Sequence, residues 1–263
     1  MSQLVNEIHI MLIFDMAAHC KRGMEMKIGI TEAGDAGFDF SWANKLYEGN
    51  IIITKQLTNK NTKLIELLLK NQDKIILHVT CTGYGGTKME PNVPSYKDVY
   101  NGVKELINRG FPINHIVLRV DPIIPTERGI QRAIDVLTYF KDMGIKRVRY
   151  SIIDLYPHVQ KRIYKEYKTL PFTGFSAPKL MVNNLLTALE PFRDFYDFEA
   201  CAEELPDKIG CISQKDFDIL GINEKAEVGG FQRKKCLCCT GKTELLTGRK
   251  RCPSGCLYCY WKD

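Results

Sequence analysis

The stretch DKIILHVTCTGYGG, residues 73–86, decides the fold of this chain. Its first half is a nearly continuous apolar and β-branched run, which is typical of a strand buried on both faces of a parallel sheet. Its second half is a glycine-containing turn, and residues 95–109 follow with a capping-box start at Ser95 and Asp98 and an end at Gly110. Strand, turn and helix in this order predict a βα unit.

The same unit recurs on both sides of this stretch. The predicted strands are 27–31, 50–55, 74–81, 115–120, 147–153 and 196–201. The predicted helices are 95–109, 127–143 and three less sharply bounded ones near 41–48, 62–71 and 177–190. The alternation predicts an α/β fold with a parallel sheet, either a partial (β/α)6 TIM-like barrel or an open doubly wound sheet. Residues 204–251 lack the alternation and are expected to be irregular and cysteine-bearing.

Polar or glycine-rich residues follow nearly every predicted strand. They are Glu32, Asp35, residues 80–86, Asp121, Asp154, Glu203 and Glu204. Because the carboxyl ends of parallel strands meet at one edge, where α/β proteins place their active sites, the set favours a barrel with its site at this rim. Turns are polar in any protein, so a single one of these residues indicates little by itself.

Composition excludes few classes of protein. The chain has 263 residues and a net charge of +6, which permits a polyanionic partner without requiring one. No apolar run approaches the roughly 20 residues that span a bilayer. The N-terminal IHIMLIF is short and has no basic residue ahead of it, so it is a poor signal peptide. We expect a cytoplasmic protein without a membrane segment.

Cysteines are numerous and unevenly placed. Eight of the ten lie between positions 201 and 259, which in a reducing compartment favours metal ligands over disulfides. Three of them, Cys252, Cys256 and Cys259, lie within CPSGCLYCYWKD, residues 252–263. Zinc ribbons present paired C-x2-C hairpins, whereas this C-x3-C-x2-C loop offers three thiolates. Three thiolates can hold three irons of a cubane cluster and leave the fourth iron open to a chelating molecule.

The loop resembles the radical S-adenosylmethionine superfamily, whose motif is C-x3-C-x-aromatic-C, with Tyr258 as the aromatic residue. The resemblance implies a [4Fe–4S] cluster whose open iron binds S-adenosylmethionine, and its reductive cleavage to a 5′-deoxyadenosyl radical that abstracts hydrogen from a substrate. It implies that Tyr258 lies near the adenine, and it implies a partial (β/α)6 barrel. In that superfamily the loop follows the first strand, so its position here implies a circular permutation.

The resemblance extends beyond the loop to one branch of the superfamily. CPSGCLYCYW, EPNVPS (90–95) and VLRVDPIIP (117–125) are similar to stretches of spore photoproduct lyase and DNA-repair-photolyase-like proteins. A domain-of-unknown-function family with the trio at its C-terminus is closer still. Its matching stretches are TGYG (82–85), EPNVP, RVDPI (119–123), CAEE (201–204), QRKKCLC (232–238) and CLYCY (256–260), which together cover about residues 26 to 262.

The match divides the chain into three parts. Residues 1–25 lie outside it, as an extra element or as the product of an upstream start codon. Residues 26–203 correspond to the partial barrel, and residues 204–263 to a cysteine-rich, cluster-binding region that completes the barrel top.

Four further cysteines match positions of the related family: Cys201, Cys211, Cys236 and Cys238. Four thiolates suit a fully ligated auxiliary iron–sulfur cluster or a structural zinc ion. Cys239 could replace Cys238 as the fourth ligand.

Polar residues at the strand ends are candidates for binding S-adenosylmethionine: Thr80, Thr82, Gly83, Arg119, Asp121 and Ser151. Arg119 and Asp121 could instead pair with each other, and Ser151 could be a core hydroxyl. Cys81 and Tyr84 are candidate catalytic donors of a hydrogen atom to a substrate radical, although a packed thiol beside a packed ring is the simpler interpretation. His78 lies mid-strand and is expected to be a core residue.

Three functions are compatible with these patterns. The first is a radical S-adenosylmethionine enzyme that takes electrons from a donor such as flavodoxin or ferredoxin. Its substrate would be a nucleic acid, suggested by the photolyase-like stretches and GRKR (248–251), or a peptide or small metabolite. The second is a zinc-stabilised module that binds nucleic acid or protein. The third is an electron carrier with two clusters, for which a whole barrel is more scaffold than electron transfer requires.

Overall fold

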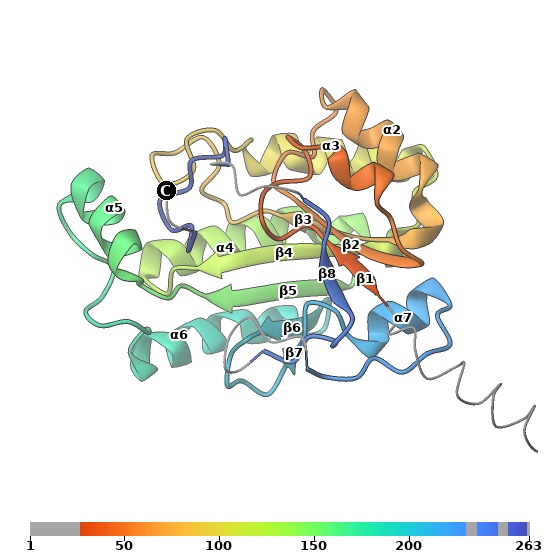
Figure 1. Ribbon diagram of the computed structural model, residues 1–263. Helices are drawn as coiled ribbons and strands as arrows, with labels where there is room; N and C mark the ends of the chain where they lie inside the picture. Colours follow the sequence, from red (N-terminus) through yellow and green to blue (C-terminus); the bar gives the residue numbers. More distant parts are fainter. Residues whose placement is uncertain (1–26, 230–235, 247–251, 262–263) are drawn as a thin grey trace, which may run out of the picture.

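A parallel sheet of eight strands, curled into a half-barrel, forms the centre of the computed structural model, which describes residues 27–229, 236–246 and 252–261 (Figure 1). The sheet order is β7-β6-β5-β4-β3-β2-β1-β8. The strands are β1 Ile28–Ile30, β2 Gly49–Thr54, β3 Ile75–Thr80, β4 Ile116–Ile123, β5 Arg147–Ile152, β6 Asp197–Cys201, β7 Lys208–Ile209 and β8 Lys242–Glu244. The predicted extension 1–25, with Cys20, lies outside the described residues.

The six predicted strands are confirmed as β1 to β6. The expectation that residues 204–251 are irregular is wrong, since β7, β8 and helix α7 (Gln214–Leu220) lie there. β7 has two residues and β8 has three, so neither is long enough to show a hydrophobic period. β8 extends the sheet beyond β1, parallel to it, and pairs Ile28 with Lys242.

The longer helices are α2 Thr62–Lys70, α3 Tyr96–Asn108, α4 Glu127–Phe140, α5 Pro157–Tyr167 and α6 Lys179–Leu189. All but α5 were predicted, and the segment near 41–48 holds only a 3-10 turn, Ser41–Asn44. Further 3-10 turns are Gln72–Lys74, Ile113–His115, Lys141–Met143 and Glu190–Phe192. The Ser95 side chain accepts a hydrogen bond from the Asp98 amide and donates one to the Asp98 carboxylate, so Ser95 caps the start of α3.

Helices α2, α3, α4 and α6 cover the outer face of the sheet. Their apolar stripes pack against the outward side chains of the central strands, among them Leu77, Val79, Leu118, Val148 and Tyr150. Each such side chain contributes about 1.5–3 kcal/mol when it leaves water. This layer is the main core. The inner face of the curled sheet is covered by other segments of the chain.

The inner face changes character along the strands. At one end Ile28, Ile51 and Ile76 pack with Phe217 of α7, so this end is apolar. Toward the carboxyl ends the inward side chains become polar, and they are His78, Thr80, Arg119, Arg149, Ser151 and Glu199. α7 therefore closes one end of the half-barrel, and the polar end faces the C-terminal segment (Figure 1).

No helix in the described part of the chain combines the length and the apolarity needed to cross a membrane.

Candidate functional site

A cavity of about 160 Å³ lies at the carboxyl ends of β1 to β5, on the predicted rim. Each of these strands or the turn after it contributes to the wall. The polar lining residues from this part are Thr31, Glu32, Asp35, Thr54, Lys55, Thr80, Arg119, Asp121, Ser151 and Asp154. The opposite wall is the C-terminal segment, with Ser254, Tyr258, Tyr260 and Trp261.

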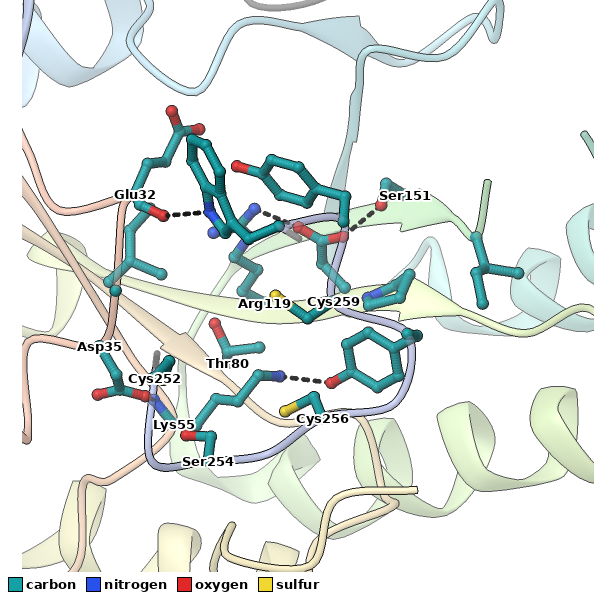
Figure 2. Close-up of a pocket in the computed structure, with 18 of the residues that line it drawn as sticks. Glu32, Asp35, Lys55, Thr80, Arg119, Ser151, Cys252, Ser254, Cys256 and Cys259 are labelled. Carbon is teal, nitrogen blue, oxygen red and sulfur yellow. Dashed lines mark hydrogen bonds and ion pairs between the residues drawn. The ribbon is translucent and has the colours of Figure 1, made fainter. Parts of the chain in front are cut away.

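The cysteines Cys252, Cys256 and Cys259 all line this cavity, and Figure 2 shows them on one loop next to Lys55, Thr80 and Arg119. Gly255 turns the loop with φ of 65°, a conformation that a side chain disfavours. Burial raises the pKa of the Cys256 thiol to about 12 and also raises that of Cys259. In the free protein these two thiols are therefore protonated at neutral pH, and binding a metal would release their protons.

Helix α5 holds the loop from outside. The Arg162 guanidinium donates hydrogen bonds to the carbonyl of Cys259 at 2.6 Å and to that of Trp261 at 3.0 Å. His158 Nε2 lies 2.8 Å from the Tyr260 carbonyl. These contacts satisfy carbonyls that a loop would otherwise leave to water, so the loop is tied to the fold.

The stretch EPNVPS holds the other side of the loop. The Asn92 side chain donates to the Pro253 carbonyl at 2.8 Å, and the Leu257 amide donates to the Met89 carbonyl at 3.0 Å. Two stretches more than 150 positions apart, both part of the family resemblance, are thus in direct contact.

A buried polar cluster lies directly behind Cys256. The Lys55 ammonium donates to the Tyr258 hydroxyl at 2.8 Å and to Glu90 at 3.0 Å, and the Tyr258 hydroxyl also donates to Glu90. Although burial alone would lower the pKa of Lys55, the negative charge of Glu90, which also accepts its hydrogen bond, outweighs burial and raises it. Lys55 is therefore a permanent cation beside a candidate metal ligand.

A second polar cluster forms the floor of the cavity. Arg119 forms an ion pair with Asp121, which also accepts a hydrogen bond from Ser151. The expected alternative of an Arg119–Asp121 pair is therefore present, and all three residues line the cavity as well. Nearby, burial and then the Cys211 thiolate raise the pKa of Glu32 to about 7, although the Glu32 side chain lies 2.5 Å from Lys242.

The remaining predicted site residues lie behind the cavity wall. Thr82 donates to Glu90 at 2.7 Å, and the Gly83 carbonyl accepts from Arg132. The Cys81 side chain belongs to the outer core, and Tyr84 packs under the Arg132 guanidinium. Burial raises the pKa of both Cys81 and Tyr84 to about 12. Of the predicted binding residues other than cysteines, Thr80, Arg119, Asp121, Ser151 and Tyr258 line the cavity.

The other cysteines gather further inside the half-barrel. Cys201 Sγ lies 3.0 Å from Cys211 Sγ, and the Cys211 amide donates to Cys238 Sγ at 3.2 Å. Cys236 contacts Cys238 and, with Cys201 and Cys211, lines a second cavity of about 40 Å³. Cys201 and Cys236, which are 35 positions apart in the sequence, thus line the same cavity.

Sequence reasoning missed three residues that shape the site. Lys55 ends a predicted strand and so belongs to the set of residues expected at the carboxyl rim. Only its hydrogen bond to the Tyr258 hydroxyl shows that it is a cation next to the cysteine loop. Glu90 lies in a loop, and its burial could not be read from the sequence. Arg162 belongs to α5, which was not predicted.

The fold and the site together define an α/β half-barrel protein with a cysteine-lined cavity at the carboxyl rim. A family model described as "Domain of unknown function (DUF1848)" matches residues 41–261, and the chain belongs to this family. No curated protein matches the chain.

Proposed function

We propose that the protein is a radical S-adenosylmethionine enzyme, with a [4Fe–4S] cluster held by Cys252, Cys256 and Cys259. The observation that carries the proposal is that these three cysteines, at C-x3-C-x2-C spacing, all line one cavity at the carboxyl rim. No fourth cysteine among the described residues lines that cavity, so a cluster there would keep one iron open.

The side chains around the loop fit such a cluster. Within the described residues, no group of three His, Cys, Asp or Glu side chains forms a ready site for a single metal ion. The C-x3-C-x2-C spacing of the loop differs from the paired C-x2-C hairpins of zinc ribbons, which favours a cluster over zinc at this loop. Ser254 Oγ is buried in the lining and has no hydrogen-bond partner among these residues, which leaves a polar group for a ligand.

The topology supports the proposed circular permutation. β8 is the strand that precedes the cysteine loop, and it lies at the edge of the sheet, parallel to β1. In the superfamily the strand before the cysteine loop is the first strand of the barrel. Under the proposal β8 corresponds to that strand, although it comes last in this chain. The rest of the half-barrel then follows in the order β1 to β6.

When bound, the cluster supplies the electron that splits S-adenosylmethionine into methionine and a 5′-deoxyadenosyl radical. The residues of this chain bind and orient the reactants. Thr80, Arg119, Asp121 and Ser151 present polar groups to the cavity, and Tyr258, fixed through its hydroxyl, places an apolar ring beside them. The electrons come from a carrier such as flavodoxin or ferredoxin.

The test is electron paramagnetic resonance of anaerobically purified, dithionite-reduced protein with and without S-adenosylmethionine. We expect a cluster signal that changes on adding S-adenosylmethionine, and whose S-adenosylmethionine-dependent part is absent in Cys256→Ala. Cys81→Ala is the matched control, because Cys81 is equally buried but lies in the outer core. Zinc without iron after reconstitution would overturn the proposal and favour a zinc-stabilised binding module.

A further inference from the structure

The cysteines inside the half-barrel form a site distinct from the terminal loop. Cys201 ends β6, Cys211 precedes α7, and Cys236 and Cys238 lie in the segment before β8. Cys211, Cys236 and Cys238 are each at most 5% exposed, and Cys201 is in contact with Cys211. A chain that buries four thiols together in this way has the donors for a fully ligated metal centre.

Buried nitrogen atoms without partners face the same region. The register places Thr80, Arg119, Arg149 and Glu199 in one row across β3 to β6, and Cys201 lies two residues beyond Glu199 on the same face. Arg149 is fully buried, yet its Nε and Nη1 atoms have no hydrogen-bond partner among the described residues. Within the same set, neither ring nitrogen of the fully buried His78 has a partner.

A buried donor that stays unpaired costs free energy, so these nitrogen atoms favour a partner that accepts hydrogen bonds. Arg119 lines the same cavity as Cys201 and Cys211, and Arg149 is its neighbour in the row. Sulfur atoms carrying negative charge would accept hydrogen bonds from these donors. The surroundings therefore suit a negatively charged, sulfur-rich group.

The spacing of the cysteines argues against zinc. Zinc sites draw ligands from C-x2-C to C-x4-C hairpins, whereas Cys236 and Cys238 are separated by one residue, and Cys201 and Cys211 by nine. The two sulfur atoms of Cys201 and Cys211, now 3.0 Å apart, would have to separate around a cluster. The cavity that both line provides a space next to them.

The structure also selects the fourth ligand. Cys238 Sγ accepts the Cys211 amide and contacts Cys236. Cys239 is just as buried and packs in the inner apolar cluster, but within the described residues its sulfur atom makes no hydrogen bond to another cysteine. Cys239 thus provides a matched control for its neighbour.

We propose that Cys201, Cys211, Cys236 and Cys238 hold a second iron–sulfur cluster, which shares a wall with the cavity of the terminal loop. The shared wall consists of Glu32, Arg119, Asp121, Ser151 and Tyr260, which line both cavities. A molecule in the larger cavity would then have a cluster on either side. This site goes beyond the proposed function and does not depend on the terminal cysteines.

The experiment compares four forms of the full chain, purified anaerobically and reconstituted with iron and sulfide. They are the wild type, the triple variant Cys252→Ala/Cys256→Ala/Cys259→Ala, Cys211→Ser, and Cys239→Ser. Iron, sulfide and zinc are measured per chain, and Mössbauer spectra identify the cluster type. We expect about eight irons in the wild type and in Cys239→Ser, and about four in the triple variant and in Cys211→Ser.

The triple variant decides the inference even if Cys211→Ser fails to fold, because any cluster that it retains must lie elsewhere than in the terminal loop. A triple variant without iron, or with one zinc per chain in its place, would overturn the second cluster. Failure of the proposed function looks different: the triple variant would bind as much iron as the wild type, and S-adenosylmethionine would leave the wild-type signal unchanged.

Discussion

Lys55 and Glu90 illustrate how single residues shape this site. Glu90 is fully buried, and its carboxylate is held by Lys55, Thr82 and the Tyr258 hydroxyl. A buried ion pair is by itself weak evidence for stability. Removing one partner is nevertheless destabilising, because it leaves the other charge buried without a counter-charge. The pair also fixes Tyr258, two positions from Cys256, so its electrostatics bear directly on the cysteine loop.

The first prediction concerns the charge of Lys55. We expect Lys55→Met to lower the free energy of unfolding by about 3–5 kcal/mol, because Glu90 then lacks its cation. Urea unfolding measures the change. Lys60→Met, on the exposed turn before α2, should change stability by less than about 0.5 kcal/mol.

Adding Glu90→Gln to Lys55→Met should restore part of the loss, because no charge is then left unpaired. Equal stability of the single and double variants would contradict a coupled pair.

At the scale of elements, helix α5 is the part of the fold that holds the cysteine loop. The second prediction is that Arg162→Gln speeds hydrogen exchange of the backbone amides at 252–261, because two or three loop carbonyls lose a charged donor worth about 1.5–3 kcal/mol. Exchange mass spectrometry measures it, with Lys165→Gln, exposed on the same helix, as the control.

If the exchange of residues 252–261 were equal in both variants and the wild type, α5 would not be the anchor. Accelerated exchange throughout the protein would instead indicate global destabilisation, and would remove the specific role of Arg162.

The elements also show what the sequence could predict. Strands β2 and β3 are largely β-branched runs, and all residues of β2, β3 and β5 are buried, so the pattern predicted these strands within two residues of their bounds. Helix α5 begins at Pro157 without a side-chain cap, and its charged sequence buries only Val159 and Ile163. Its stability comes from tertiary contacts with the cysteine loop and neighbouring segments, and the local sequence pattern does not show such contacts.

The residues of the site also divide into those that the sequence predicts and those that it does not. The rim rule and cysteine spacing locate residues that lie at strand ends or in one loop, such as Asp121, Ser151 and Cys256. The contact of Asn92 with Pro253 joins segments 161 positions apart, and the buried Glu90 meets Tyr258, which is 168 positions away. Such contacts depend on how the sheet curls, which a single sequence does not reveal.

At the scale of the whole molecule, an ionic network joins the sheet to the helix that closes its end. Arg147 on β5 pairs with Glu199 on β6 at 2.7 Å and with Asp216 of α7 at 2.8 Å, and Arg149 also binds Glu199. All four side chains are at most 4% exposed. The network lies between the apolar end and the cysteines proposed for the second cluster, so it couples that site to the stability of the fold.

The third prediction follows from the pKa of Glu199. Burial alone would raise it, but Arg149 and Arg147 outweigh burial and lower it from 4.5 to about 2. Between these values the unfolded chain binds more protons than the folded one. The contribution of Glu199 is therefore complete above about pH 4.5 and is lost as the pH falls toward 2. The lowered pKa corresponds to roughly 3 kcal/mol.

Urea unfolding of wild type and Glu199→Gln between pH 3 and pH 7 tests this pH dependence. We expect the variant to be less stable by about 3–5 kcal/mol at pH 7, since Arg149 then lacks its carboxylate, and the difference to shrink as the pH falls below 4.5. A difference that stayed constant down to pH 3 would mean that Glu199 stabilises the fold by packing and not through its charge.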